Sequence, residues 1–418
     1  MKVLVVGGGG REHAIVWKLS QNKDIDTIYC APGNGGIAGL ARCVDIKATD
    51  IDGIVEFAKT NEIDLTVVAP DDPLVLGMVD ELEKNGLRAF GPRKTAAIIE
   101  GSKVFSKQLM KKYGIPTAEY EVFDNSAAAV EYVKTKAVPI VVKADGLALG
   151  KGVIIANTHD EAIAAIHDIM DDKMFGNAGN KVVIEQFLTG QEVSVLAFTD
   201  GKTLVPMVSA QDHKRVYDND KGPNTGGMGA FSPSRIYDEK TAKYCFDNIF
   251  IPTMNAMNKE GRTFKGVLYF GLIITAEGVY VIEYNCRFGD PETQAVLPRL
   301  KSDLFEIFNA VIDEKLDKIN IEWYDDAAAC VVMASGGYPK KYTSGYEITG
   351  IDDAQKGGAV VFHAGTKIQD GKTITAGGRV LGVTAMGKTL DEAIKNAYSG
   401  VEKIAFCDAH YRKDIGIK

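Results

Sequence analysis

The chain begins with KVLVVGGGGREHA at positions 2–14, the stretch that decides the fold of its first part. Residues 2–6 have the apolar composition of a buried β-strand, glycines follow at 7–10, and a predicted helix runs from Glu12 to Ser20. Predicted strands at 26–30 and 64–69 alternate with a predicted helix near 51–60. Continuous apolar strands that alternate with helices are typical of a parallel sheet covered on both faces. Residues 1–101 are therefore predicted to form a Rossmann-like α/β domain, an open parallel sheet built through right-handed crossovers.

The remainder of the chain has a mixed α+β pattern. Predicted strands at 139–144 and 152–156 flank a glycine-bearing loop, and a helix is predicted to start at Thr158, where Glu161 has capping-box spacing. The segments 267–274 and 279–286 are predicted to form a hairpin around 276–278. A domain at 102–318, with a smaller unit at about 118–189, and a C-terminal α+β domain at 325–418 are expected.

Composition excludes several classes of protein. The chain has 418 residues, 25% of them charged, and a net charge of −8, which disfavours nucleic-acid and polybasic membrane binding. No stretch approaches the ~18–20 apolar residues of a membrane span, and the N-terminal apolar run ends too early for a signal peptide. The six cysteines are scattered without a CxxC pair, which predicts a cytoplasmic protein with reduced thiols and no zinc ribbon.

The glycine run at 7–10 is a candidate phosphate site, because backbone amides at a helix N-terminus attract anions. A dinucleotide site would require a glycine where the chain has Glu12, and an acid at the end of the second strand, whereas Asp26 stands at its beginning. A phosphate ligand is favoured, with a tight structural turn and a dinucleotide site as the alternatives.

A second phosphate-like pattern, GVTAMGKT at 382–389, matches the Walker A motif. Its context differs, because 379–386 is predicted to be one strand and Thr389 with Glu392 has the spacing of a helix cap. We therefore predict that Lys388 does not bind nucleotide.

The loop 145–151 is a better nucleotide candidate. It lies between Lys143 and Gly152 and contains Gly146, Gly150 and Lys151, so its amides and one cation could close over phosphates. The alternative is an ordinary hairpin with a surface lysine.

The segment VIEYNCRFGDPET at 281–293 carries the strongest combination of polar residues. Alternation along a strand places Glu283, Asn285 and Arg287 on one face. Carboxylate and amide oxygens suit Mg²⁺, and the arginine could stabilise an anionic transition state. The alternative is a solvated polar face.

The segments QDHKR (211–215) and TGGMGA (225–230) combine cations, an acid and glycines. Together they are predicted to form a substrate clamp, with a charged surface turn as the alternative. None of the six histidines has the spacing of paired zinc ligands.

Eight motifs together resemble the phosphoribosylamine–glycine ligases, an ATP-grasp family of purine biosynthesis. In chain order they are GGREHA (9–14), APGN (31–34), KADGLA (143–148), GKGV (150–153), QDHKR, GPNTGGMG (222–229), EYNCRFGDPETQ (283–294) and RKDIG (412–416). The resemblance covers the whole chain. Two features differ from the pattern of the group: APDDP at 69–73 replaces a GPE motif, and the strand 268–274 lacks the acidic metal ligand common in ATP-grasp enzymes.

The resemblance implies a central ATP-grasp domain at 102–318 with a lid at about 118–189. It implies that ATP phosphorylates the carboxylate of glycine and that the amine of 5-phosphoribosylamine displaces the phosphate, with one or two Mg²⁺ or Mn²⁺ ions. The protein is expected to be a monomer with no nucleic-acid or membrane partner.

The resemblance also implies roles for individual residues. The catalytic residues are Arg287, Asp212 and Lys151, and the metal ligands are Glu283 and Asn285. ATP is bound by Lys103, Lys143, Gly146, Gly150, Gly152, Glu185, Phe187, Leu188 and, through its ribose, Glu192. The other substrates are bound by Gly9, Gly10, Arg11, Asn34, Lys214, Arg215, Gly226, Gly227 and Asp290.

Three other functions remain to be weighed. Another ATP-grasp carboxylate–amine ligase would share 143–152 and 283–287 but lack the GGREHA start. An NAD-dependent oxidoreductase is disfavoured by Glu12. A non-catalytic nucleotide sensor would not need both Glu283 and Arg287.

Overall fold

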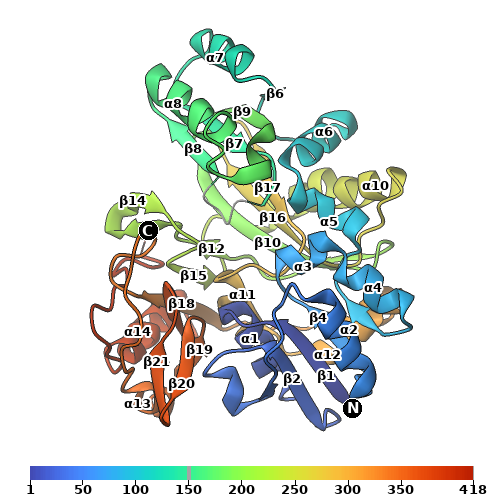
Figure 1. Ribbon diagram of the computed structural model, residues 1–418, viewed down its shortest axis with the longest axis vertical. Helices are drawn as coiled ribbons and strands as arrows, with labels where there is room; N and C mark the ends of the chain where they lie inside the picture. Colours follow the sequence, from blue (N-terminus) through green and yellow to red (C-terminus); the bar gives the residue numbers. More distant parts are fainter. Residues whose placement is uncertain (148–151, 418) are drawn as a thin grey trace.

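A computed structural model describes residues 1–147 and 152–417. Figure 1 shows the N-terminal and C-terminal parts side by side at one end of the long axis and a small α/β unit at the other end, with the central part between them. None of the helices in these two ranges has the length and apolarity needed to cross a membrane.

The N-terminal part is a five-stranded parallel sheet in the order β3-β2-β1-β4-β5, which confirms the predicted Rossmann-like fold. Val3 and Val5 pack into one hydrophobic cluster and Leu4 and Val6 into another, so β1 is buried on both faces. The strands are β1 Lys2–Gly7, β2 Thr27–Pro32, β3 Arg42–Cys43, β4 Leu65–Val68 and β5 Ala89–Phe90. The helices are α1 Gly10–Leu19, α2 Ile51–Thr60, α3 Asp71–Leu76, α4 Met78–Lys84 and α5 Lys94–Gly101, with a 3₁₀ turn at Ile37–Gly39.

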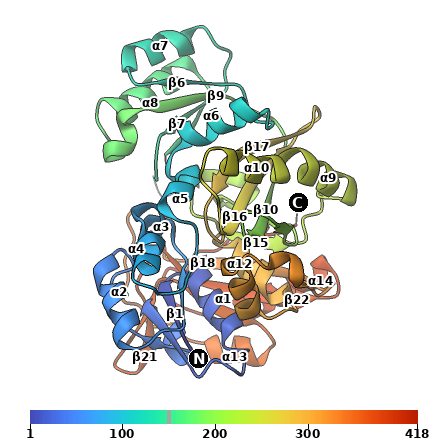
Figure 2. The ribbon, with the colours of Figure 1, turned by 90° about the vertical axis from the view of Figure 1, so that its right-hand side faces the viewer.

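The unit at the far end of the molecule is an antiparallel sheet in the order β6-β9-β7-β8, with two helices packed together against it (Figures 1 and 2). As predicted, Thr158 caps the second of these helices, its Oγ1 accepting from the Glu161 amide at 3.2 Å. The strands are β6 Tyr120–Phe123, β7 Ile140–Ala144, β8 Val153–Ala156 and β9 Val182–Gln186. The helices are α6 Lys103–Tyr113, which leads into the unit, α7 Ser126–Lys134 and α8 His159–Met170, with a 3₁₀ turn at Gly176–Asn180.

The central part contains an antiparallel sheet in the order β11-β10-β16-β17, whose last two strands are the predicted hairpin. The strands are β10 Gln191–Thr199, β11 Leu204–Pro206, β16 Gly266–Ile274 and β17 Val279–Asn285. The helices are α9 Glu239–Cys245, α10 Ile251–Lys259, α11 Glu292–Val296 and α12 Leu304–Ile312, with a π-helical segment at Phe246–Phe250 and 3₁₀ turns at Leu297–Arg299 and Leu316–Lys318.

A fourth sheet, in the order β12-β15-β18-β22-β19, joins the central and C-terminal parts. Two of its strands, β12 and β15, precede residue 240, and the other three follow residue 326. Its strands are β12 Gln211–Asp212, β15 Gly229–Ser232, β18 Ala327–Ala334, β19 Val360–His363 and β22 Arg379–Gly387. Beside it lie two hairpins, β13 Arg215–Tyr217 with β14 Lys221–Asn224 and β20 Thr366–Gln369 with β21 Lys372–Thr375. A 3₁₀ turn at Asp218–Asp220 joins β13 to β14, and the helices are α13 Ile351–Lys356 and α14 Leu390–Val401.

The Walker-like segment has the predicted structure. Gly382 lies inside β22, and Thr389 caps α14, its Oγ1 accepting from the Glu392 amide at 3.2 Å. The Lys388 side chain is exposed and pairs with Asp326 at 2.8 Å. Residues 382–389 therefore do not form the loop that leads into a helix and binds phosphate in Walker A proteins.

Candidate active site

A cavity of about 550 Å³ lies between the central sheet and the small α/β unit and extends to α1 and Arg379. Most residues predicted for the site line it: Arg11, Lys103, Lys143, Gly146, Gly152, Glu185, Phe187, Leu188, Glu192, Asp212, Lys214, Gly226, Glu283, Asn285, Arg287 and Asp290. Of the other predicted residues, Gly9, Gly10, Asn34, Arg215 and Gly227 are not part of its wall. Gly150 and Lys151 lie outside the described residues.

A β-bulge places the acid of β17 in this cavity. Gly271 pairs with Glu283 and Leu272 with Val281, so Ile282 is an extra residue in the strand. Simple alternation would put Val281 and Glu283 on one face. The bulge allows Val281 and Tyr284 to pack in the core while Glu283 and Asn285 line the cavity.

One end of the cavity is strongly cationic. Glu185 holds two buried lysines, with its carboxylate 2.9 Å from Lys107 Nζ and 3.0 Å from Lys143 Nζ. Lys103 Nζ donates to the Gly146 carbonyl at 2.9 Å, and burial lowers its pKa. Burial also lowers the pKa of Lys107 to about 8. Lys107 was not among the predicted residues, although it lies four residues after Lys103 and therefore on the same helix face.

Glu283 and Asn285 lie next to an arginine that is held by other acids. Arg287 Nη2 pairs with Glu100 at 2.8 Å and with Asp71 at 3.8 Å, while Glu100 Oε2 accepts from the Cys286 amide at 2.7 Å. Asp71 is the residue of the divergent APDDP motif, so the shorter acid still reaches this arginine. Glu100 was missed because no sequence pattern links it to a strand almost 190 residues later.

The Glu283 carboxylate accepts no hydrogen bond from any described residue. Burial opposes its charged form, but the cations Lys214, Lys143, Lys103 and Arg287 outweigh burial and lower its pKa. An anionic carboxylate with free lone pairs beside an amide oxygen is a donor set suited to Mg²⁺, which takes few protein ligands and completes its shell with water and phosphate oxygens.

The middle of the cavity contains a cluster of acids around Lys214. Lys214 Nζ lies 2.5 Å from Glu192 Oε2. Burial, together with the charges of Glu292, Glu192 and Glu283, raises the pKa of Asp212 to about 7 against the opposing charge of Lys214. Glu292 accepts from Tyr269 at 2.9 Å. Such a cluster can bind an amine or hold a proton near neutral pH.

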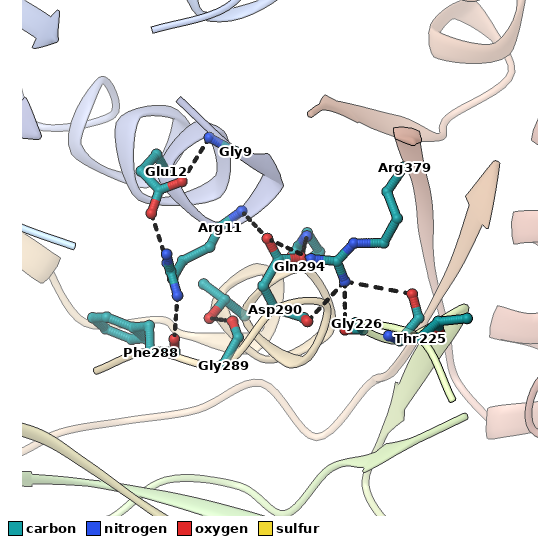
Figure 3. Close-up of polar contacts among 12 residues, drawn as sticks. Gly9, Arg11, Glu12, Thr225, Gly226, Phe288, Gly289, Asp290, Gln294 and Arg379 are labelled. Carbon is teal, nitrogen blue, oxygen red and sulfur yellow. Dashed lines mark hydrogen bonds and ion pairs between the residues drawn. The ribbon is translucent and has the colours of Figure 1, made fainter. Parts of the chain in front are cut away.

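Three parts of the chain meet at Asp290, as Figure 3 shows. The Arg11 amide donates to its Oδ2 at 3.4 Å, and Arg379 Nη2 lies 3.3 Å from the same oxygen. Arg379 Nη1 also donates to the carbonyls of Asp290 and Gly226, at 2.9 and 2.6 Å. Arg379 was not among the predicted residues, because it lies at the start of a strand in the C-terminal part, far from the site motifs in the sequence.

Helix α1 begins at Gly10, within the glycine run and two residues before the predicted start at Glu12. Glu12 is buried and accepts from the Gly9 amide at 2.6 Å and from Arg11 Nε at 2.6 Å. Its side chain fills the space above Gly7, where an added Cβ would lie 2.5 Å from Glu12 Cγ. The acid that replaces the third glycine of a dinucleotide motif therefore closes this turn.

Two predicted substrate residues have other contacts in the structure. The Asn34 side chain donates to the carbonyls of Gly8 and His363, at 2.9 and 2.8 Å. Arg215 Nη1 donates to the Gly222 carbonyl across the hairpin β13–β14 at 2.7 Å. Both residues support loops beside the cavity.

The chain is similar to known proteins along its whole length. Models of the phosphoribosylglycinamide synthetase N domain, ATP-grasp (A) domain and C domain match residues 1–100, 101–293 and 328–418. The phosphoribosylamine–glycine ligase of Clostridium acetobutylicum is 52% identical over 416 residues, covering 100% of this chain and 99% of that protein. The crystal structure of phosphoribosylamine–glycine ligase from Thermotoga maritima superposes with a TM-score of 0.85 and 34% identity, covering both chains in full.

A more distant structure shares the fold. The biotin carboxylase domain of 2-oxoglutarate carboxylase from Hydrogenobacter thermophilus, solved with MgADP, has a TM-score of 0.75 at 15% identity, covering 98% of this chain and 91% of that chain.

The fold and the cavity define an ATP-grasp protein, a class whose enzymes use ATP and Mg²⁺. Within that class, the chain belongs to the phosphoribosylglycinamide synthetase family, whose curated members are named phosphoribosylamine–glycine ligases.

Proposed function

We propose that this protein joins glycine to 5-phosphoribosylamine at the expense of ATP, giving 5-phosphoribosylglycinamide, ADP and phosphate. The observation that carries the proposal is one cavity that combines three lysines, the pair Glu283 and Asn285, and the acid cluster around Lys214. Family membership supports the choice of substrates.

The proposed chemistry has two steps. A glycine carboxylate oxygen attacks the γ-phosphorus of ATP, ADP leaves, and glycyl phosphate forms. The amine nitrogen of phosphoribosylamine then attacks the glycyl carbonyl carbon, the C–O bond to phosphate breaks, and the nitrogen loses a proton. Neither step needs a covalent enzyme intermediate, so catalysis depends on positioning and on charge neutralisation.

The cationic end of the cavity is proposed to hold the ATP phosphates. Lys103 and Lys143 would contact them, together with Lys151 and the glycines of the loop 146–152. Glu185, Phe187 and Leu188 would border the adenine, and Glu192 the ribose. Glu283 and Asn285 would hold one or two Mg²⁺ or Mn²⁺ ions, which supply charge neutralisation to the phosphates.

The other substrates are proposed to occupy the opposite side of the cavity. Arg287 would stabilise negative charge on the reacting groups, and Asp212 would hold a proton beside them. Lys214, Arg215, Gly226, Gly227 and Asp290 would bind glycine or phosphoribosylamine, and Gly9, Gly10, Arg11 and Asn34 the phosphoribosyl end. The N-terminus of α1 would favour an anion there through its positive partial charge, while its Gly9 and Arg11 amides donate to Glu12 and Asp290.

We further propose that the chain works in the cytoplasm as a monomer of three domains, 1–101, 102–318 and 325–418. Its six cysteines, all of them among the described residues, are free thiols, as expected in a reducing compartment.

The test is the rate of ADP release with each substrate omitted in turn. Turnover should require glycine and phosphoribosylamine together, and omission of either should slow ADP release by at least about tenfold, because a water-labile acyl phosphate should form only in a filled site. Rapid ATP hydrolysis with neither substrate present would contradict the proposal.

A further inference from the structure

The C-terminal motif RKDIG, residues 412–416, lies outside the cavity wall and has no role in the proposed chemistry. Figure 1 shows the end of the chain beside hairpin β13–β14. Several polar contacts of this segment, which we call the C-terminal strap, reach residues 213–220, and others reach Tyr398 and Arg235.

Arg412 is the centre of the strap. Its side chain is fully buried and forms a two-pronged pair with Asp414, Nε to Oδ1 at 2.7 Å and Nη2 to Oδ2 at 2.8 Å. Its third nitrogen, Nη1, lies 2.9 Å from Asp220 Oδ1 and donates to the Arg215 carbonyl at 3.0 Å. The planar guanidinium therefore joins the strap to the start of β13 and to the end of the turn after it, a geometry that a lysine cannot reproduce.

The other strap contacts reach the same segment. The Lys413 amide donates to Asp218 Oδ1 at 2.8 Å, and Asp414 Oδ2 accepts from the Asn219 amide at 2.8 Å. The Gly416 amide donates to His213 Nε2 at 3.0 Å.

Lys214 lies between two of these anchored residues. Because side chains alternate along extended chain, His213 points to the strap while Lys214 points into the cavity. The Lys214 carbonyl in turn accepts from both the amide and the hydroxyl of Thr225, each at 2.8 Å, and Thr225 and Gly226 line the cavity. The strap thus fixes the backbone from which Lys214 and the loop 225–227 reach the substrates.

We infer that Arg412 is a positioning residue for the ligation reaction, acting through the backbone of residues 213–215 to hold Lys214 in place. This inference rests on the proposed role of Lys214 in the site. The alternative is that the strap only stabilises the fold. The two roles, positioning and stabilisation, make different predictions. Only a positioning role predicts that loss of the forked Arg412 contacts changes catalysis in a protein that remains folded and binds ATP.

The test is the variant Arg412→Lys, which keeps the buried charge and loses the fork. We expect kcat to fall by about 10- to 100-fold, the cost of a small misplacement of a reacting group. The KM for ATP should change much less than kcat, because the lysines proposed to hold the ATP phosphates make no contact with the strap, and only Glu192, which pairs with Lys214, links the two. Asp414→Asn, which breaks the same pair from its other side, should behave alike, and Lys413→Ala, whose side chain is exposed, should match the wild type.

Hydrogen exchange and a double mutant separate positioning from stability. In Arg412→Lys the amides of Thr225 and Met228, which donate to the carbonyls of Lys214 and His213, should exchange faster, while those of β10 and β16 stay protected. In a Lys214→Ala background, Arg412→Lys should cost little further activity.

An unchanged kcat in Arg412→Lys would overturn the inference. So would a loss of ATP binding in the folded variant, or a double mutant in which Arg412→Lys reduces activity as much as it does in the wild-type background. If the wild-type chain forms no product at all, the proposed function fails instead, and the exchange data alone then decide whether Arg412 holds this segment.

Discussion

At the scale of single residues, Glu283 combines charge with unused bonding capacity. Four cations keep its carboxylate ionised, yet no described residue donates a hydrogen bond to it. Its neighbour Asn285 is bonded only weakly, by Arg287 at 3.4 Å. A half-buried, ionised carboxylate with free lone pairs can bind a divalent cation that carries phosphates.

Glu283→Gln should therefore lower kcat by at least about 10²-fold at saturating Mg²⁺, because it removes one negative charge and keeps the shape. Thermal unfolding should change little. The readout is ADP release over a range of Mg²⁺ concentrations, with Glu277→Gln, in the exposed turn of the same hairpin, as the matched control. Near-normal activity of Glu283→Gln would show that this residue is not a metal ligand.

At the scale of elements, context decides what a motif does. The segment 382–389 has the letters of a phosphate loop, but β22 continues through its first glycine and α14 begins after its lysine. The helix cap at Thr389 was predictable because its signal is local. The bulge at Ile282 was not, because it depends on how β17 pairs with β16.

Lys388→Ala should leave ATP affinity within about threefold of the wild type, since Lys388 is exposed, pairs with Asp326 and does not line the cavity. Nucleotide titration of the folded variant measures this. Lys143→Ala, at the cationic end of the cavity, should weaken binding much more in the same assay. A large loss in Lys388→Ala would mean that nucleotide binds at the end of β22.

At the scale of the whole molecule, the N-terminal and C-terminal parts meet through a pair of buried histidines. The His363 amide on β19 donates to His13 Nδ1 on α1 at 2.7 Å, and the two rings are 5.5 Å apart. Burial lowers the pKa of His13 to about 3 and that of His363 to about 4. Both rings are therefore neutral in the folded protein.

This pair should make the fold sensitive to mild acid. Below about pH 6.5 these histidines take up protons in the unfolded chain but stay neutral in the folded chain. The free energy of unfolding therefore has its full value above that pH and falls progressively toward pH 4. His13→Asn can accept the same hydrogen bond without titrating. Between pH 7.5 and pH 5, the free energy of unfolding should fall less in His13→Asn than in the wild type, by roughly 2 kcal/mol. His159→Asn is the control, and an equal fall in all three proteins would contradict the assignment.

Local sequence signals predicted much of the fold. The apolar run at 2–6, the cap at Thr158 and the hairpin around 276–278 each depend on residues close together in the chain. The polar face at the end of β17 was predictable for the same reason, since Glu283 and Asn285, and Arg287 just after the strand, lie on alternate positions. The family resemblance added roles for residues such as Lys103 and Glu192, which no local pattern assigns.

Only the tertiary structure could decide what depends on distant segments. The sheet that joins β12 and β15 to β18 pairs strands about a hundred residues apart. The contacts of Glu100 with Arg287, of Arg379 with Asp290 and of Arg412 with Asp220 span 187, 89 and 192 residues. Sequence periodicity reports which side of an element is buried, but not what covers it. The partners of these buried charges were therefore decided by packing.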